Sequence, residues 1–115
     1  MIALKRIYDS TEPADGVRVL VDRLWPRGVK RETAAIDHWA KAIAPSTELR
    51  QWYDHRPERW PEFQMRYRLE LGADAAVAEL ARLKSIAKTK TVTLLTATRS
   101  ETENHTIVLR QMLVE

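Results

Sequence analysis

Short apolar and β-branched runs mark the strands of a sheet in this chain. Residues 17–21, VRVLV, alternate with the two-residue period of a strand, and Asp22 ends the run. Residues 91–97, TVTLLTA, are apolar on both faces, so we expect a strand buried on both sides, as in a parallel sheet. A weaker alternation over residues 2–7 predicts a third strand near the start of the chain.

Apolar residues recur at helical spacing in the segments between and after these strands. Ser46 is a good N-cap for a short helix, and Pro57 suits the first turn of a longer one. Residues 100–103, SETE, have the capping-box form S-x-x-E, which opens a final helix. We therefore expect helices over residues 33–43, 47–53, 57–71, 73–87 and 100–113.

The order of these elements predicts the fold class. Strand, strand, several helices, strand and helix is an order typical of an α/β fold. At 115 residues the chain has the length of one domain. We expect a small single domain over residues 1–115, with a few-stranded, mostly parallel sheet flanked by helices. The apolar faces turned inward are predicted to carry Trp60, Phe63, Tyr67 and Leu71 in one helix and Val77, Leu80, Leu83 and Ala87 in the next.

The composition excludes several classes of site and of location. The chain has no cysteine, which rules out disulfides, zinc–thiolate sites, iron–sulfur clusters and thiol nucleophiles. No apolar run is long enough to span a bilayer, and residues 1–10 lack the h-region of a signal peptide, so we expect a cytoplasmic protein without membrane contact. The formal net charge of +3 permits binding of phosphate or nucleic acid without requiring it.

Familiar motifs for metals and cofactors are missing from the sequence. The three histidines, His38, His55 and His105, lie far apart and form no H-x-x-x-H pair. The three glycines are scattered, so there is no glycine-rich phosphate loop, and no G-x-S-x-G nucleophile elbow occurs. We therefore predict neither a metal site nor a cofactor.

The loop after the second strand carries the most unusual chemistry in the chain. Asp22 ends the apolar run, and Arg23, Trp25, Arg27 and Gly28 follow within one bend. Ordinary turns are made from Asn, Asp, Ser, Gly and Pro. A carboxylate, two guanidinium groups and an indole in one turn indicate a loop built to hold an anion or a partner.

A second loop, over residues 97–104, is expected to lie beside the first. If the two best strands are parallel neighbours, their carboxyl ends meet at one edge of the sheet, where ligands of α/β proteins bind. Arg23 or Arg27 would then converge with Arg99, and the last helix would add the free N–H groups of its N-terminus. The predicted anion-binding residues are Arg23, Trp25, Arg27, Arg99, Ser100 and Asn104.

Two residues near these loops are candidates for proton chemistry. Asp22 would orient a guanidinium group or act as a base, and His105, in the first turn of the last helix, is the histidine best placed for acid–base work. A structural interpretation stays open beside this one. In that case Asp22 pairs with Arg27 or Arg99 to lock the two loops together. Trp25 then plugs the core beneath the turn.

Residues 49–55, LRQWYDH, form a second cluster of aromatic and basic side chains. Aromatic rings beside an arginine suit the stacking of bases in single-stranded nucleic acid. Leu49, Trp52 and Tyr53 also have the helical spacing of core residues, and we favour a place in the core for them.

One string, residues 21–28 (VDRLWPRG), is long and unusual enough to indicate relatives. It is accompanied by further matching strings at residues 6–8, 15–16, 37–41, 44–46, 48–52, 59–63 and 66–67. With these residues the chain resembles the YeaO-like branch of the family called domain of unknown function 488. The resemblance covers almost the whole chain and implies a compact prokaryotic α/β domain with no settled activity.

The loop at residues 98–100 departs from the pattern of that family. Similar proteins usually read A-R-D there, whereas this chain reads Thr98-Arg99-Ser100. The resemblance therefore implies no catalytic carboxylate at this place, although the arginine and a helix-capping serine remain. Some members carry a transcriptional-regulator label, but this chain shows no helix-turn-helix or winged pattern.

The leading hypothesis from the sequence is a pocket for a phosphorylated or carboxylated small molecule, in either a binding protein or an enzyme. Arg23, Arg27 and Arg99 would hold the anion. Asp22 would orient them, and Trp25 would form a wall of the pocket.

Two other functions stay open, and the sequence predicts no oligomeric state. Binding of RNA or DNA is suggested by Lys30 and Arg31 beside the loop, and its affinity would fall steeply with salt. A protein-interaction surface is suggested by one charged helical face. That face carries Arg59, Glu62, Arg66 and Glu70.

Overall fold

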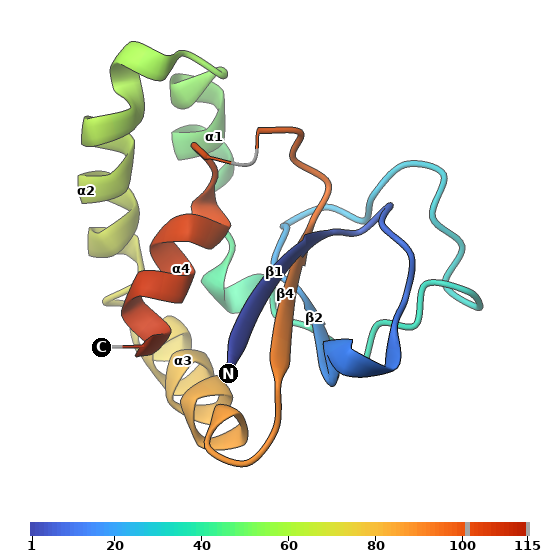
Figure 1. The fold of residues 1–115 in the computed structure, drawn as a ribbon. Helices are drawn as coiled ribbons and strands as arrows, with labels where there is room; N and C mark the ends of the chain where they lie inside the picture. Colours follow the sequence, from blue (N-terminus) through green and yellow to red (C-terminus); the bar gives the residue numbers. More distant parts are fainter. Residues whose placement is uncertain (101, 115) are drawn as a thin grey trace.

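Parallel strands form one sheet in the computed structural model, which describes residues 1–100 and 102–114 (Figure 1). Their order across the sheet is β1-β4-β2-β3, and every neighbouring pair is parallel. The predicted α/β fold is therefore confirmed, and the sheet of the described residues is parallel throughout. The strands are β1 (Ile2–Arg6), β2 (Val17–Leu20), β3 (His38–Trp39) and β4 (Val92–Thr96).

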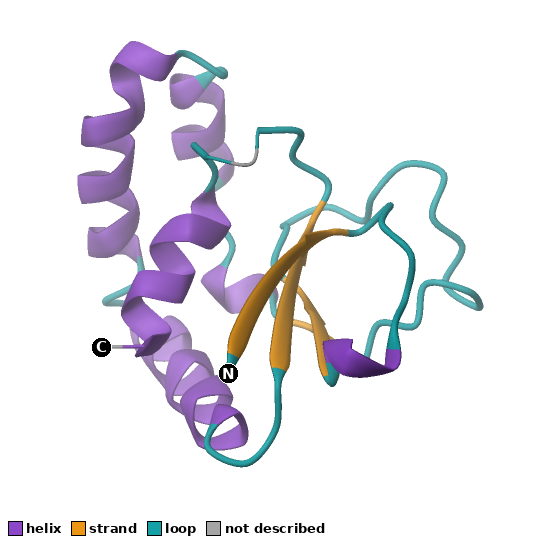
Figure 2. Cartoon of the chain, viewed as in Figure 1, coloured by secondary structure: helices purple, strands orange, loops and turns teal. Residues whose placement is uncertain are grey.

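The α-helices of the described residues gather on one side of this sheet, and loops cover the other side (Figures 1 and 2). The looped side includes residues 22–37 and the short 3-10 turn η1 (Pro13–Asp15). Within residues 1–100 and 102–114, no helix combines the length and the apolar character needed to cross a bilayer. The helices are α1 (Thr47–Tyr53), α2 (Trp60–Glu70), α3 (Asp74–Ala87) and α4 (His105–Val114), with 3-10 turns η2 (Lys41–Ile43) and η3 (Pro57–Arg59) before α1 and α2.

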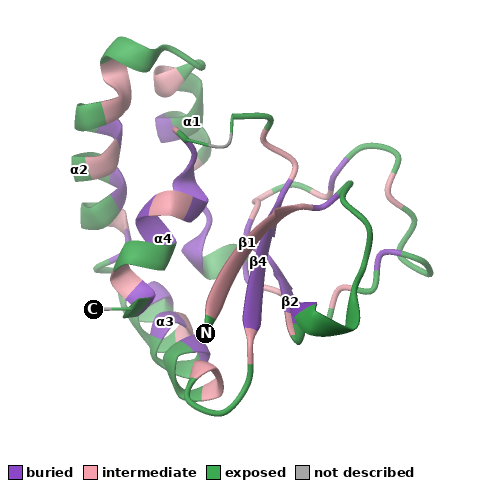
Figure 3. Cartoon of the chain, viewed as in Figure 1, coloured by how far each residue is buried: buried purple, intermediate pink, exposed green. Residues whose placement is uncertain are grey.

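β4 lies at the centre of the sheet, and all of its residues are buried (Figure 3). Val92 and Leu94 pack with the helices in the main core. Leu95 packs with Ile7 and Leu20 in a second, smaller core on the looped side. Polar and apolar residues do not alternate along β4 because each face of the strand packs against an apolar layer.

The helix predicted over residues 47–53 has the expected boundaries, and the one predicted over residues 57–71 begins with the 3-10 turn η3 and continues as α2. α1 spans residues 47–53, and the Ser46 hydroxyl caps it by accepting the backbone N–H of Leu49 at 3.1 Å. α2 follows Pro57 and turns Phe63 and Tyr67 into the core, where both are buried. Local signals are sufficient here because the cap and the apolar face agree with each other.

The helix predicted over residues 33–43 is wrong. The segment instead makes turns, the two-residue strand β3 and the 3-10 turn η2. Ala35 has a positive φ of 51°, which a helix excludes. Asp37 donates its backbone N–H to the Arg18 carbonyl and Ala40 donates to that of Leu20. These long-range bonds pair the segment with the edge of β2, which would otherwise expose its unpaired backbone groups.

The remaining helices are shifted relative to their predictions. In α3 the predicted inward residue Val77 is 52% exposed, and its neighbour Ala76 is buried with Leu80 and Leu83. The last helix begins at His105 rather than near Ser100. The spacing of apolar residues did not define which residues of α3 face inward, or at which residue α4 begins, to better than a few positions. Packing against the rest of the structure decided both.

Gly16 links η1 to β2 and provides the first test of this fold. Its φ is +63°, and a Cβ there would lie 2.3 Å from the Thr91 carbonyl oxygen. Backbone strain and steric overlap act together, so Gly16→Ala should lower the free energy of unfolding by about 2–4 kcal/mol, measured by urea denaturation. The matched control is Gly28→Ala: φ is +74° there but nothing lies within 4 Å of the new Cβ. Equal losses in both variants would show that the contact with Thr91 is unimportant.

Candidate functional site

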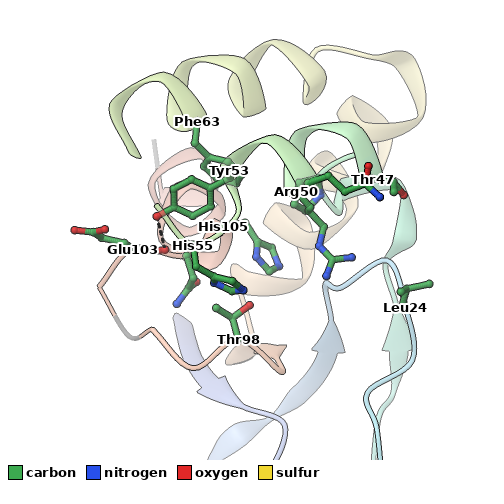
Figure 4. A pocket seen from close by; sticks show the side chains of 12 residues that line it. Leu24, Thr47, Arg50, Tyr53, His55, Phe63, Thr98, Glu103 and His105 are labelled. Atoms are coloured by element: carbon green, nitrogen blue, oxygen red, sulfur yellow. Dashed lines mark hydrogen bonds between the residues drawn. The ribbon is translucent and has the colours of Figure 1, made fainter. Parts of the chain in front are cut away.

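Two cavities that share lining residues form one cleft at the carboxyl ends of β2 and β4, and Figure 4 shows the side chains that line one of them. Their volumes are about 320 and 530 Å³. α1 and the turn after it form one wall of the cleft, and the loop after β4 together with the start of α4 forms the opposite wall. The residues that line both cavities are Pro45, Arg50, His55, Thr98 and His105.

The carboxylate of Asp22 ties together the segments that meet at this cleft. Its Oδ2 accepts the backbone N–H of Ala97 at 2.8 Å, and its Oδ1 accepts the hydroxyl of Thr96 at 2.7 Å. The Nε2 atom of His105 lies 3.0 Å from the same Oδ1. Burial by itself raises the pKa of Asp22, but the hydrogen bond and charge of His105, together with the donors on β4, hold that pKa below its usual range.

His105 is oriented by this carboxylate and lines both cavities. Its Nε2 is also 3.1 Å from the Val21 carbonyl oxygen. Both neighbours of Nε2 are acceptors, so this nitrogen carries a proton. Nδ1 has no hydrogen-bond partner among the described residues, and every fully buried side-chain nitrogen and oxygen in that part of the chain has one, so Nδ1 is not fully buried.

The predicted arginines divide into two kinds. Arg23 and Arg99 both line the larger cavity, as the strand-end argument expected. The guanidinium of Arg23 donates to the carbonyl oxygens of Pro45 and Ala44, each at 3.1 Å, and so anchors the segment that leads into α1. Arg99 is exposed, and its side chain has no partner among residues 1–100 and 102–114. No described residue therefore competes with a ligand for this guanidinium group.

Arg27 and Trp25 lie outside both cavities of the cleft. Arg27 is exposed beside a neighbouring depression, and its backbone carbonyl accepts the hydroxyl of Tyr8. Trp25 donates its indole N–H to the Val29 carbonyl at 2.7 Å and packs edge-on against Trp39, 5.3 Å between ring centroids. This is the placement that the structural interpretation of Trp25 expects: a plug beneath the turn, on the looped side of the sheet.

Ser100 and Asn104 shape the start of the last helix. The Ser100 hydroxyl accepts the backbone N–H of Glu103 at 3.1 Å, which is the capping contact expected from the sequence. The helix begins later, because Asn104 provides the cap: its Oδ1 accepts the backbone N–H of Thr106 at 2.8 Å. Asn104 is buried and still contributes to the wall of the smaller cavity.

The prediction from sequence missed Arg50 and His55, which both line the cleft. The interpretation of residues 49–55 as core holds for Leu49, which is buried, and Trp52 and Tyr53 are partly buried and pack against the core. Arg50 on α1 and His55 in the turn after it line the cleft instead. His55 and Asp54 both have positive φ, 54° and 49°. These consecutive left-handed residues hold the imidazole of His55 at the cleft, where it has no partner among the described residues.

Neither a metal site nor an additional acid cluster accompanies these residues. In the part of the chain that the structure describes, no three His, Cys, Asp or Glu side chains are grouped so that they could hold a metal ion. The charged and titratable groups that line the cleft are therefore guanidinium and imidazole groups and the carboxylates of the partly buried residues Asp22 and Glu103.

Comparison with known protein families shows to which family the chain belongs. A model of the family described as the inactive DUF488-N3 subclade matches the chain over residues 1–115. The chain belongs to the DUF488 family. The resemblance seen in the sequence is thereby confirmed.

Its DUF488 relatives carry no assigned activity. The uncharacterized protein Rv3073c of Mycobacterium tuberculosis is 46% identical over 112 residues, which are 97% of this chain and 92% of that protein. The uncharacterized protein YeaO of Escherichia coli is 44% identical over 112 residues, 97% of this chain and 96% of YeaO. No solved structure matches the chain significantly.

The hydrogen bonds of Asp22 give a test of the site's architecture. We expect Asp22→Asn to lower the free energy of unfolding at pH 7 by about 1–3 kcal/mol, because an amide cannot replace all three contacts. The pKa of Asp22 is lower in the folded protein than its unfolded value of about 3.9. The stabilisation is therefore fully present above about pH 4 and is lost as the pH falls through the folded-state pKa.

Urea denaturation at neutral and at acidic pH measures this effect. The gap between wild type and Asp22→Asn should narrow below about pH 4. Glu32→Gln is the control, since Glu32 is exposed and makes no hydrogen bond or ion pair with another described residue. A gap of constant size at both pH values would contradict the charge-based role of Asp22.

Proposed function

We propose that this DUF488 protein binds a small anionic molecule, carrying a phosphate or carboxylate group, in the cleft between α1 and the loop after β4. The observation that carries the proposal is that Arg50 and Arg99, from distant segments, line one cavity with guanidinium groups that no described residue engages. A planar guanidinium forms paired hydrogen bonds with phosphate and carboxylate oxygens.

The balance of charge around the cleft supports an anion. Arg23 adds a third positive charge, although its N–H groups are engaged by carbonyl oxygens. The acidic residue that lines the larger cavity is Asp22, and its carboxylate already accepts hydrogen bonds from Thr96 and Ala97. An entering anion would therefore meet the positive charges of Arg50 and Arg99, which no described residue pairs. In a concave site this electrostatic attraction is stronger than on an open surface.

Binding without turnover fits this chain better than catalysis. The family model that matches it is described as an inactive subclade. The loop at the cleft has Ser100 where the family pattern suggests an acid, and that hydroxyl is used to accept a backbone N–H. The remaining acid and base, Asp22 and His105, connect strand ends to α4 and so have a structural task.

A small ligand also fits better than nucleic acid. Stacking of bases needs free aromatic faces. Trp52 is covered by Arg59 and by Arg66, whose guanidinium carbon lies 4.3 Å from the ring centroid. Trp25 is covered by Arg31 at 4.4 Å. These cation–π contacts occupy the rings that would otherwise attract a single strand.

The charged helical face proposed for a protein partner is partly used within the chain. Arg66 pairs with Glu62 on the surface, and Glu70 accepts hydrogen bonds from the backbone N–H and the hydroxyl of Ser46. Met65 and Leu69 are exposed on α2, but isolated apolar side chains are common on protein surfaces. Several charged groups of this face are therefore already engaged within the chain and not free for a protein partner.

Arginine variants test the binding site, with inorganic phosphate as the probe. Arg50→Ala and Arg99→Ala should each weaken phosphate binding about tenfold or more in isothermal titration, as expected for the loss of a charged hydrogen bond. Arg50→Lys should recover part of the affinity, because it keeps the charge and loses the paired geometry.

Arg82→Ala is the matched control, because Arg82 lies on α3 and pairs with Glu79. It should bind phosphate like the wild type. If Arg82→Ala weakened binding as much as the two cleft variants, the attraction would come from net charge alone and the proposed site would be wrong.

The absence of turnover is tested separately. Ribose 5-phosphate incubated with the protein should keep its phosphate ester over hours, as followed by ³¹P NMR, because no acid replaces the one missing at residue 100. Release of inorganic phosphate above the rate in buffer, lost in His105→Gln, would contradict the non-catalytic proposal.

A further inference from the structure

The cleft is larger and more apolar than a phosphate group requires. Apolar side chains line the smaller cavity on two sides, with Tyr53 and Phe63 on one side and Leu24 on the other (Figure 4). Tyr53 and Phe63 pack against each other at 4.7 Å between centroids and form a fixed aromatic wall. Leu24, at the mouth of the cavity, is 67% exposed, so a ligand that covers it would be stabilised by the burial of apolar surface.

Polar groups stand beside this wall. Thr47 and Gln51 extend from α1 into the lining of the smaller cavity, and no described residue engages the Gln51 amide. An amide offers both donors and an acceptor, which is what the polar edge of a heterocycle requires. Tyr53 is fixed by its own hydrogen bond to the Glu103 carbonyl, so the wall keeps its place.

The apolar part and the cationic part belong to one space. Arg50 and His55 line both cavities, and Arg99 lines the cationic one. Each cavity lies in or near the size range of small-ligand sites, which is about 300–1,000 Å³. A ligand that fills the cleft therefore combines a ring of moderate size with an anionic group a short distance away.

We propose that the ligand is a nucleoside monophosphate. This inference rests on the proposed function and adds the class of ligand. The phosphate lies between Arg50 and Arg99, where the guanidinium groups reach it from two sides. The base lies between Leu24 and the wall of Tyr53 and Phe63, and its polar edge meets the Gln51 amide. The two parts of the cleft thus recognise the two parts of one molecule.

Isothermal titration with four mononucleotides, AMP, GMP, CMP and UMP, tests the inference against ribose 5-phosphate and inorganic phosphate. At least one nucleotide should bind about tenfold more tightly than ribose 5-phosphate, as expected for covering one large apolar side chain. Leu24→Ser should remove most of that advantage and leave the affinity for ribose 5-phosphate unchanged. Arg99→Ala should weaken binding of both.

Leu69→Ser is the matched control, since it removes an equally exposed leucine from α2, away from the cleft. It should bind every probe like the wild type. Equal affinity for the nucleotides and ribose 5-phosphate, with both weakened by Arg99→Ala, would overturn the nucleotide inference and leave the anion site standing. No binding of any probe, phosphate included, would overturn the proposed function itself.

Discussion

The partly buried carboxylate of Asp22 holds the ends of two strands and the start of a helix in one place. It accepts donors from Thr96 and Ala97 at the end of β4 and faces His105 at the start of α4. Each of these donors belongs to a segment that would otherwise end freely at the edge of the sheet. This one carboxylate is satisfied from several directions, and its depressed pKa keeps it charged further into the acidic range than an ordinary aspartate.

The two sides of the sheet solve the problem of covering apolar surface differently. Helices bury one face through a large aliphatic and aromatic core. The other face has a loop, and Trp25 and Trp39 supply the area that a helix would have provided. Arg31 and Lys41 lie over these rings and shield them from water. Trp25, in the turn after β2, therefore packs against the second core, whereas Asp22 and Arg23 at the start of that turn line the cleft.

Much of the fold could be predicted from local pattern. The strands at residues 17–21 and 91–97 and the capped helix at residues 47–53 all appear, because each has a cap or an apolar period that agrees with its surroundings. Residues 33–43 show the limit of this approach. Their apolar spacing suits a helix, but the open edge of β2 offers backbone hydrogen bonds from a distant segment, and those bonds prevail.

The candidate site shows the same division. The sequence by itself predicted a mostly parallel sheet and the loops at its carboxyl edge, and it predicted that Arg23 or Arg27 would meet Arg99 only if the two strands were neighbours. The structure brings Arg23 and Arg99 together. The sequence could not determine which arginines clamp the backbone and which stay free, since a guanidinium suits both tasks. The tertiary structure decided this: Arg6, Arg18 and Arg23 donate to carbonyl oxygens of loops, and Arg50 lines the cleft without a partner among the described residues. The reason is physical, because a carbonyl left without a donor is known only once distant segments have packed together.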